Sequence, residues 1–201
     1  MKWSALLSAI IATAAFGAMS PAHAQTVPAA YMGQLPFTLG TGVSNFNVDW
    51  GDSRMYGITA WAQWRPGMLP PILDGLGLDI EGRDINYGRP STVPSNFRMD
   101  TLAGGPMYTW HRYRNFQPYG KFLIGLGSID FTSSNPYYKH DTRTIYAPGG
   151  GVQYRLIRHI WVRGDYEYQM WPQLFGNNKT LDPQGFTIGV SYDFRSLRRF
   201  E

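Results

Sequence analysis

The sequence predicts an all-β protein, an eight-stranded antiparallel up-and-down barrel that spans a membrane. Three observations predict it. Eight segments alternate large apolar residues with small or polar ones, and a period of two places these two kinds of residue on opposite faces of a strand. The connections between the segments are short and long by turns, which is typical of membrane barrels. The N-terminus has the pattern of an export signal.

The first 24 residues have the three parts of a secretory signal peptide. Lys2 supplies the positive charge, Ala5–Met19 is apolar and uncharged, and Ala22-His23-Ala24 is a small-x-small cleavage site. The apolar run is shorter than the roughly 20 residues that a spanning helix needs. We therefore expect residues 1–24 to be a cleaved signal peptide and residues 25–201 to be the barrel domain.

The composition excludes several classes of site. The chain has no Cys, so disulfides, iron–sulfur clusters and thiolate sites are impossible. The net charge of +4 suggests a nucleic-acid partner, which would need basic residues and stacking aromatics along one groove. The bases, among them Arg65, Arg155 and Arg158, instead fall at turns expected on the periplasmic side. We expect no nucleic-acid partner, and a cationic rim facing lipid phosphates or solvent.

The first two strands are expected at Pro36–Phe46 and Arg54–Trp64. In the first, Phe46 falls on the face opposite to the earlier apolar residues, which predicts a bulge or a strand end near Asn45. In the second, the alternation places Trp61 inward, for which the pattern gives no reason. The following stretch, Pro66–Asp74, contains three prolines and is predicted to be a turn.

The remaining strands continue the alternation, although Pro106 is unexpected because proline removes a ladder donor. Long polar loops are expected after the third, fifth and seventh strands, and they lie outside the cell if the N-terminus is periplasmic. The six strands are predicted at Leu76–Arg83, Arg98–Trp110, Pro118–Ile129, Thr144–Arg155, Ile160–Met170 and Gly185–Phe194. The three loops are predicted at Asp84–Asn96, Asp130–Arg143 and Trp171–Gln184.

Charged residues fall in the inward phase of several strands. The interior of an eight-stranded barrel is just wide enough to be filled by side chains, and the third and seventh strands lie about half a turn apart. We therefore expect a charge-paired lumen that plugs the barrel; a narrow ion path is the alternative. The expected network consists of Asp79, Glu81, Arg83, Lys121, Arg155, Arg163, Asp165, Glu167 and Asp193.

An enzymatic site is not predicted. His140, beside Asp141, is the one histidine expected in an outer loop, and no nucleophile held against it is evident. No spacing of His, Asp and Glu suggests a metal site. We expect no catalytic residue, no metal and no cofactor.

The last strand carries a motif of polar, Gly, aromatic and aromatic residues at Thr187, Gly189, Tyr192 and Phe194. It resembles the C-terminal β-signal read by the barrel assembly machinery. The mature chain resembles the small eight-stranded barrels of the OmpA/OmpX type. The resemblance implies an outer-membrane location, contact with outer-membrane lipid and insertion by that machinery. The chain departs from the pattern in that Arg195–Glu201 follow the final aromatic residue.

We expect a structural or surface-interaction role through the three long loops. The alternatives are a narrow channel, a lipid-modifying enzyme and a soluble lipocalin-like barrel that binds a ligand. In the last of these the apolar face points inward, and alternation alone does not tell the two sides apart.

Overall fold

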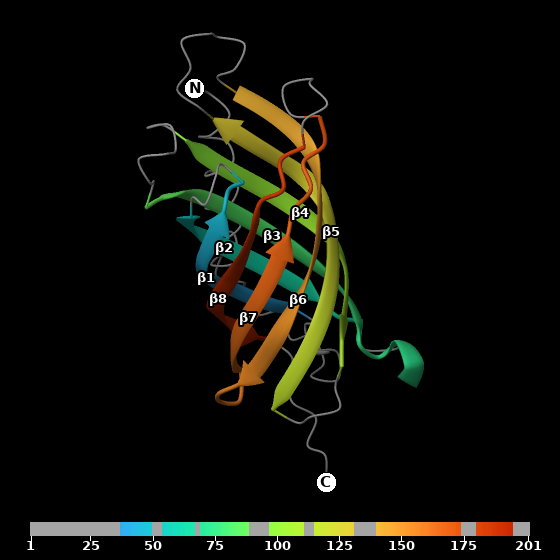
Figure 1. Cartoon of the computed structure of the whole chain (residues 1–201). Coiled ribbons are helices and arrows are strands. Elements are labelled where there is room, and N and C mark those ends of the chain that lie inside the picture. Colours follow the sequence, from blue (N-terminus) through green and yellow to red (C-terminus); the bar gives the residue numbers. More distant parts are fainter. Residues whose placement is uncertain are drawn as a thin grey trace, which may run out of the picture. The chain divides into compact units, whose positions relative to one another are not determined.

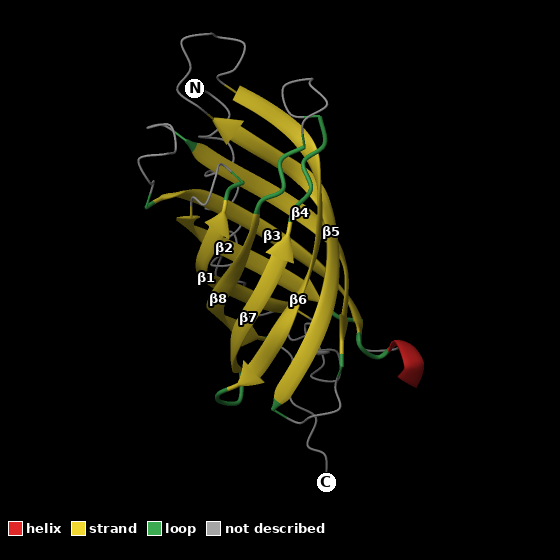
Figure 2. Cartoon of the chain, viewed as in Figure 1, coloured by secondary structure: helices red, strands yellow, loops and turns green. Residues whose placement is uncertain are grey.

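The computed structural model describes residues 37–49, 54–66, 69–88, 97–110, 115–130, 140–173 and 180–194. They form a closed antiparallel barrel in which every strand pairs with its sequence neighbours and β8 pairs with β1 (Figures 1 and 2). The predicted fold class is confirmed. The strands are β1 (Phe37–Asn47), β2 (Arg54–Trp64), β3 (Leu76–Tyr87), β4 (Arg98–Thr109), β5 (Phe116–Asp130), β6 (His140–Arg155), β7 (Ile160–Tyr168) and β8 (Gln184–Asp193).

Two expected segments, the signal peptide at 1–24 and the tail Arg195–Glu201, lie outside the described residues. In the part of the chain that is described, no helix is long and apolar enough to cross a membrane. We call the end at which β1–β2, β3–β4, β5–β6 and β7–β8 connect the loop end. The end at which β2–β3, β4–β5 and β6–β7 connect is the turn end.

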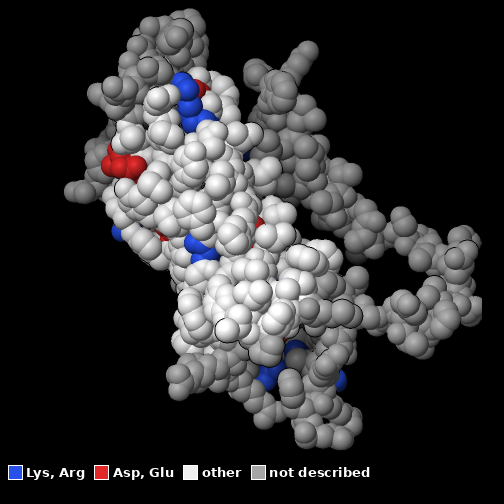
Figure 3. Space-filling model, turned by 90° about the vertical axis from the view of Figure 1, so that its right-hand side faces the viewer, with Lys and Arg blue, Asp and Glu red and all other residues white. Residues whose placement is uncertain are grey.

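The outer surface of the barrel is apolar. Along β8, Ile188 is 59% exposed whereas Ser191 is 5% exposed, and the same alternation runs along the other strands. The face drawn in Figure 3 is mostly uncharged. This sidedness is the one predicted for a membrane barrel and the reverse of that in a lipocalin-like barrel. The outward residues include Leu39, Val43, Ile58, Leu78, Ile80, Leu102, Phe122, Ile124, Leu126, Tyr166, Phe186, Ile188 and Val190.

Two strands are longer than predicted at the loop end. β3 continues to Tyr87 and β6 begins at His140, so the predicted limits of the loops Asp84–Asn96 and Asp130–Arg143 are wrong. Polar side chains pair across the ladder there, with Arg98 Nη2 2.8 Å from Asp84 Oδ2 and His140 Nδ1 2.6 Å from Asp130 Oδ1. Polar side chains thus extend the sheet beyond its apolar band.

Of the two alternatives predicted near Asn45, the bulge is wrong, and the strand ends shortly afterwards at Asn47. β1 pairs without interruption through Asn47 with both of its neighbours, and the register shift lies between Tyr56 and Gly57 in the β2–β3 pair. Phe46 faces inward by ordinary alternation. It seemed out of phase because the interior was expected to be polar, and at this end it is not.

The structure accounts for the two residues that the pattern left unexplained. Pro106 pairs with β3, but the pairing of β4 with β5 is interrupted at Gly105 and Pro106, so the missing donor falls at a gap in the ladder. Trp61 lies against Gly40, where an added Cβ would come 2.3 Å from the indole ring. The absent side chain on β1 makes room for this ring inside the barrel.

Candidate functional site

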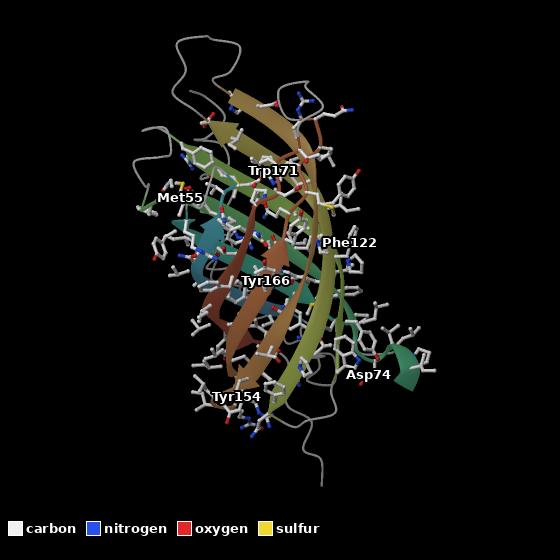
Figure 4. All side chains as sticks on the ribbon, in the orientation of Figure 1. Met55, Asp74, Phe122, Tyr154, Tyr166 and Trp171 are labelled. Carbon is white, nitrogen blue, oxygen red and sulfur yellow. The ribbon has the colours of Figure 1, made fainter. Side chains whose placement is uncertain are left out.

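The interior of the barrel holds three groups of side chains, one above another. The ionic layer consists of Asp79, Glu81, Arg83, Tyr119, Lys121, Arg163, Asp165 and Glu167. Toward the turn end lies the amide layer, formed by Gln63, Arg65, Gln117 and Gln153. Toward the loop end lies the apolar layer, formed by Phe46, Val48, Met55, Ile85, Phe97, Met99, Ala103, Leu123, Ile129, Ile145, Ala147, Trp171 and Leu181. Figure 4 shows Met55 and Trp171 in this upper part of the barrel.

The ionic layer comes from three strands that run in the same direction, β3, β5 and β7. Successive inward positions on one strand are two residues apart, so each strand contributes a short run of polar groups. β3 supplies residues 79, 81 and 83, β5 supplies 119 and 121, and β7 supplies 163, 165 and 167. Every one of these side chains is buried.

Arg163 lies at the centre of the ionic layer. Its Nε donates to Asp165 Oδ2 at 2.9 Å, and its Nη2 contacts both Asp165 and Glu81. Nη1 is 3.1 Å from Asp79 Oδ2, an ion pair that lacks the alignment of a hydrogen bond. The guanidinium also lies over the rings of Trp61, at 4.7 Å, and Tyr119, at 5.0 Å.

Lys121 and Arg83 complete the ionic layer. Lys121 Nζ lies 2.5 Å from Glu81 Oε1, 2.8 Å from Glu167 Oε2 and 3.2 Å from Asp165 Oδ2. Arg83 Nη1 donates to Glu167 Oε1 at 2.7 Å, and its Nη2 is 3.2 Å from Glu81 Oε2. Because β3, β5 and β7 are not neighbours in the barrel, the pairs of Lys121 and the pair of Arg83 with Glu167 cross the lumen, whereas Arg83 and Glu81 pair within β3.

Such a cluster is stable only as a unit. Each of the three cations contacts at least two carboxylates, and Tyr119 Oη adds a donor to Asp165 Oδ2 at 2.7 Å. A buried charge that loses its partner is left uncompensated at a cost of several kcal/mol, about 3–5. The contacts of one side chain therefore determine whether its neighbours remain acceptable in the interior.

Two residues expected in this network lie elsewhere. Arg155, at the turn end of β6, donates from Nη2 to Asn115 Oδ1 at 2.8 Å, and its guanidinium lies 5.7 Å from the ring of Trp161. Asp193 is the last residue of β8, and its backbone N–H donates to His159 O at 2.8 Å. The structure thus joins seven of the nine predicted residues and places these two at the end of the barrel.

The amide layer contains a correction to the expected cationic rim. Arg65 does not face lipid or solvent; it is buried and donates from Nη2 to Gln153 Oε1 at 2.9 Å and to Gln63 Oε1 at 3.2 Å. Gln153 Nε2 in turn donates to Gln63 Oε1 at 3.0 Å. The position after β2 continues the inward phase of the strand, which carries Arg65 into the mouth of the barrel.

The apolar layer was not predicted from the sequence. It contacts the ionic layer in two places: the Arg83 guanidinium lies 4.4 Å from the ring of Phe46, and Trp171 Nε1 donates to Gln169 Oε1 at 3.0 Å, with Gln169 donating on to Glu167. The signal was present, because Phe46 and Met55 stand in the inward phase of their strands. The apolar layer is missed when every large apolar residue is assigned to the lipid-facing surface.

A closed barrel with this exterior matches a known family. Residues 8–194 match the family model described as outer membrane protein beta-barrel domain. The chain belongs to this family. Its place is accordingly the outer membrane, in contact with lipid. No curated protein sequence matches the chain significantly.

Solved structures of barrels resemble this member of the outer membrane protein beta-barrel family. Neisserial surface protein A aligns at 15% identity and a TM-score of 0.61, over 81% of this chain and 99% of the other. The attachment invasion locus protein Ail of Yersinia pestis aligns at 17% identity and a TM-score of 0.48, over 79% of this chain and 96% of the other. The N-terminal barrel of Pseudomonas aeruginosa OprF aligns at 14% identity and a TM-score of 0.46, over 80% of this chain and 99% of the other. At these identities the first likeness shows the fold alone.

His140 has different partners from those expected for this family member. Its Nδ1 lies 2.6 Å from Asp130 Oδ1 and its Nε2 lies 3.1 Å from Thr142 Oγ1, whereas Asp141 accepts from Arg143 Nε at 3.0 Å. The His140 and Asp130 side chains are well exposed. Within the described ranges, no group of three or more His, Asp or Glu is arranged to hold a metal ion.

The motif that resembles the assembly signal is divided between the two faces of β8. Thr187 is buried and its Oγ1 lies 2.7 Å from Ser44 Oγ. A Cβ at Gly189 would come 2.3 Å from Thr41 O, so that position requires glycine. Tyr192 and Phe194 are exposed on the outer surface and pack edge to face at 4.8 Å.

Proposed function

We propose that this outer-membrane barrel serves a structural and surface-contact role in the cell envelope, with a lumen that is plugged by charged side chains and does not conduct. The observation that carries the proposal is the ionic layer, in which β3, β5 and β7 meet across the interior through Arg163, Lys121 and Arg83. An ion path needs a lumen that water can occupy, and at this level side chains occupy it.

The apolar layer supports the same proposal. Trp171, Phe46 and Phe97 are completely buried at the loop end, above the ionic layer. A hydrophobic constriction of this kind opposes wetting even where its radius would admit an ion. A permeating ion would therefore have to pass a dry segment and then separate paired charges.

Because the lumen is closed in this proposal, contacts with molecules outside the membrane are made by residues at the loop end. Charged groups gather there on the extended strands, among them Asp84, Arg98 and Asp100. We place this end outside the cell, with the cleaved signal peptide and the β-signal at Thr187, Gly189, Tyr192 and Phe194 directing export and insertion by the barrel assembly machinery. The connections β3–β4, β5–β6 and β7–β8 at this end are then the contact elements, whereas the side chain of Trp171 belongs to the buried apolar layer.

Conductance across a planar lipid bilayer tests the plug. The purified mature barrel is expected to insert without producing unitary current steps, because the ionic and apolar layers leave no continuous aqueous path. Heat-modified mobility on a gel would verify that the sample is folded. Arg163→Gln and Arg155→Gln would be compared with the native chain, because the second arginine lies outside the ionic layer.

The narrow channel is the outcome that would overturn the proposal. It would appear as unitary steps in the native protein whose size changes in Arg163→Gln and stays constant in Arg155→Gln. Silence in all three folded proteins would agree with the plug.

A further inference from the structure

The connection between β2 and β3 leaves the wall of the barrel at the turn end. Its central part is a single 3-10 turn, η3 (Pro71–Leu73), which projects sideways from the strands in Figures 1 and 2. The other two connections at this end, β4–β5 and β6–β7, have no helix among their described residues. The projection is therefore a distinct feature of one side of the barrel.

The projection is apolar and exposed. Ile72 is 81% and Leu73 41% exposed, and Asp74 is the one charged residue between positions 66 and 75 of the sequence. Large aliphatic side chains at the tip of a water-facing turn are unfavourable, because apolar surface in water carries a free-energy cost. Transfer of the same side chains from water into lipid lowers the free energy.

Several backbone contacts hold the projection in place. Leu73 N–H donates to Pro70 O at 2.8 Å, which closes the 3-10 turn, and Thr109 N–H donates to Gly75 O at 2.8 Å. A Cβ at Gly75 would lie 2.1 Å from Thr109 O, so this close approach to β4 requires glycine. Tyr108 Oη reaches Ile72 O at 3.4 Å. The aliphatic tip is thus tied to the wall at its base and at its middle.

The residues beside the projection belong to the lipid-facing surface. Tyr108 packs edge to face against Trp110 at 5.2 Å, and Leu76 and Leu78 follow on the outer face of β3. Aromatic residues of this kind mark the level at which a barrel meets the membrane–water interface. Figure 4 shows Asp74 toward the same end of the barrel as Tyr154.

We propose that residues 70–74 are an interfacial lipid anchor, with Ile72 and Leu73 inserted at the boundary between the head groups and acyl chains of the leaflet at the turn end. The partner is phospholipid, because the projection is continuous with the lipid-facing surface through Tyr108 and Trp110. An aliphatic contact at one point of the circumference opposes axial displacement of the barrel relative to that leaflet, because displacement would move the apolar side chains into water.

The chain has no native cysteine, so single labelled positions test the anchor directly. Ile72→Cys would carry an environment-sensitive fluorophore in phosphatidylcholine vesicles that contain lipids with quenchers at different depths. Ile124→Cys, on the lipid-facing surface of β5, is the deep reference, and Thr180→Cys, exposed at the loop end, is the aqueous reference. We expect quenching at position 72 by the shallow quencher, at least twofold stronger than at position 180.

Two results would overturn the anchor. With iodide present on both sides of the vesicle membrane, iodide quenching at position 72 equal to that at position 180 would place the tip in water. Energy transfer between labels at position 72 on different barrels, at high lipid excess, would instead assign the tip to contact between copies. If the label perturbs the turn, the unlabelled Leu73→Trp variant gives a second measurement, with a blue-shifted emission component expected from lipid contact and a loss of that component on Ile72→Ser.

Discussion

Arg163 shows how a single residue can determine the interior of this barrel. Its guanidinium contacts carboxylates from both β3 and β7 and lies over the rings of two aromatic residues. Arginine suits this position because its planar fork reaches several acceptors at once and stays charged. The neighbouring acids are acceptable in the interior because this cation and Lys121 pair with them.

Replacing Arg163 with Ala is expected to destabilise the barrel by about 3–5 kcal/mol, because Asp79, Glu81 and Asp165 would lose a partner while remaining buried. Equilibrium unfolding in urea from lipid vesicles measures this change. Arg155→Ala is the matched control: its hydrogen bond to Asn115 is exposed, and a change below about 1 kcal/mol is expected. Equal losses in the two variants would contradict the central role of Arg163.

At the scale of single elements, strand β8 carries the lipid contact in its simplest form. Its outward residues run from Phe186 to Tyr192, Phe194 continues the series just beyond the strand, and the inward side chains include Thr187, Ser191 and Asp193. The free-energy cost of a charged substitution on the lipid-facing surface depends on its depth in the bilayer. The costs at successive positions along one strand therefore indicate how far each position lies from water. The ladder with β1 and β7 is continuous, so a substitution on the outer face changes solvation with little change in pairing.

Arginine substitutions along β8 are expected to have graded effects. Ile188→Arg places a charge in the hydrocarbon and should cost about 2–4 kcal/mol, whereas Phe194→Arg lies beyond the strand end and should cost about 0–1 kcal/mol. Urea unfolding of both variants from the same vesicles provides the comparison. A larger loss at Phe194 than at Ile188 would mean that the membrane-embedded part of β8 is assigned incorrectly.

The strands could be predicted because alternation is a local signal. The limits of β2 agree with the prediction at both ends. The extensions of β3 and β6 could not be predicted, since they depend on pairs such as Asp84 with Arg98 that join separate strands. Hydrophobicity stops at the edge of the lipid, whereas backbone pairing does not.

The candidate site could be predicted in part for the same reason. Inward phase identified Asp79, Arg163 and the other members of the ionic layer. The inward phase of a residue does not show how far along the barrel axis the residue lies. The pattern alone therefore places Arg155 with charges that lie deeper in the barrel. The apolar layer requires both phase and height: Phe46 and Met55 are inward like the charges but lie at the loop end.

At the scale of the whole barrel, closure of the sheet creates both the outer surface and the enclosed interior. An open edge in lipid would leave backbone donors and acceptors unsatisfied, and the pairing of β1 with β8 removes that edge. Closure also creates an interior, and the buried side chains of the amide, ionic and apolar layers lie within it. The exterior is then free to be apolar throughout its central band.

Spin labels at Ile188→Cys and Ser191→Cys in lipid bilayers test this sidedness most directly. The label at position 188 is expected to be accessible to dissolved oxygen and protected from a water-soluble nickel reagent, because that side chain faces hydrocarbon. The label at position 191 is expected to be immobilised by the packed interior and protected from oxygen. The reverse result, with position 188 immobilised and position 191 accessible to oxygen, would contradict the account.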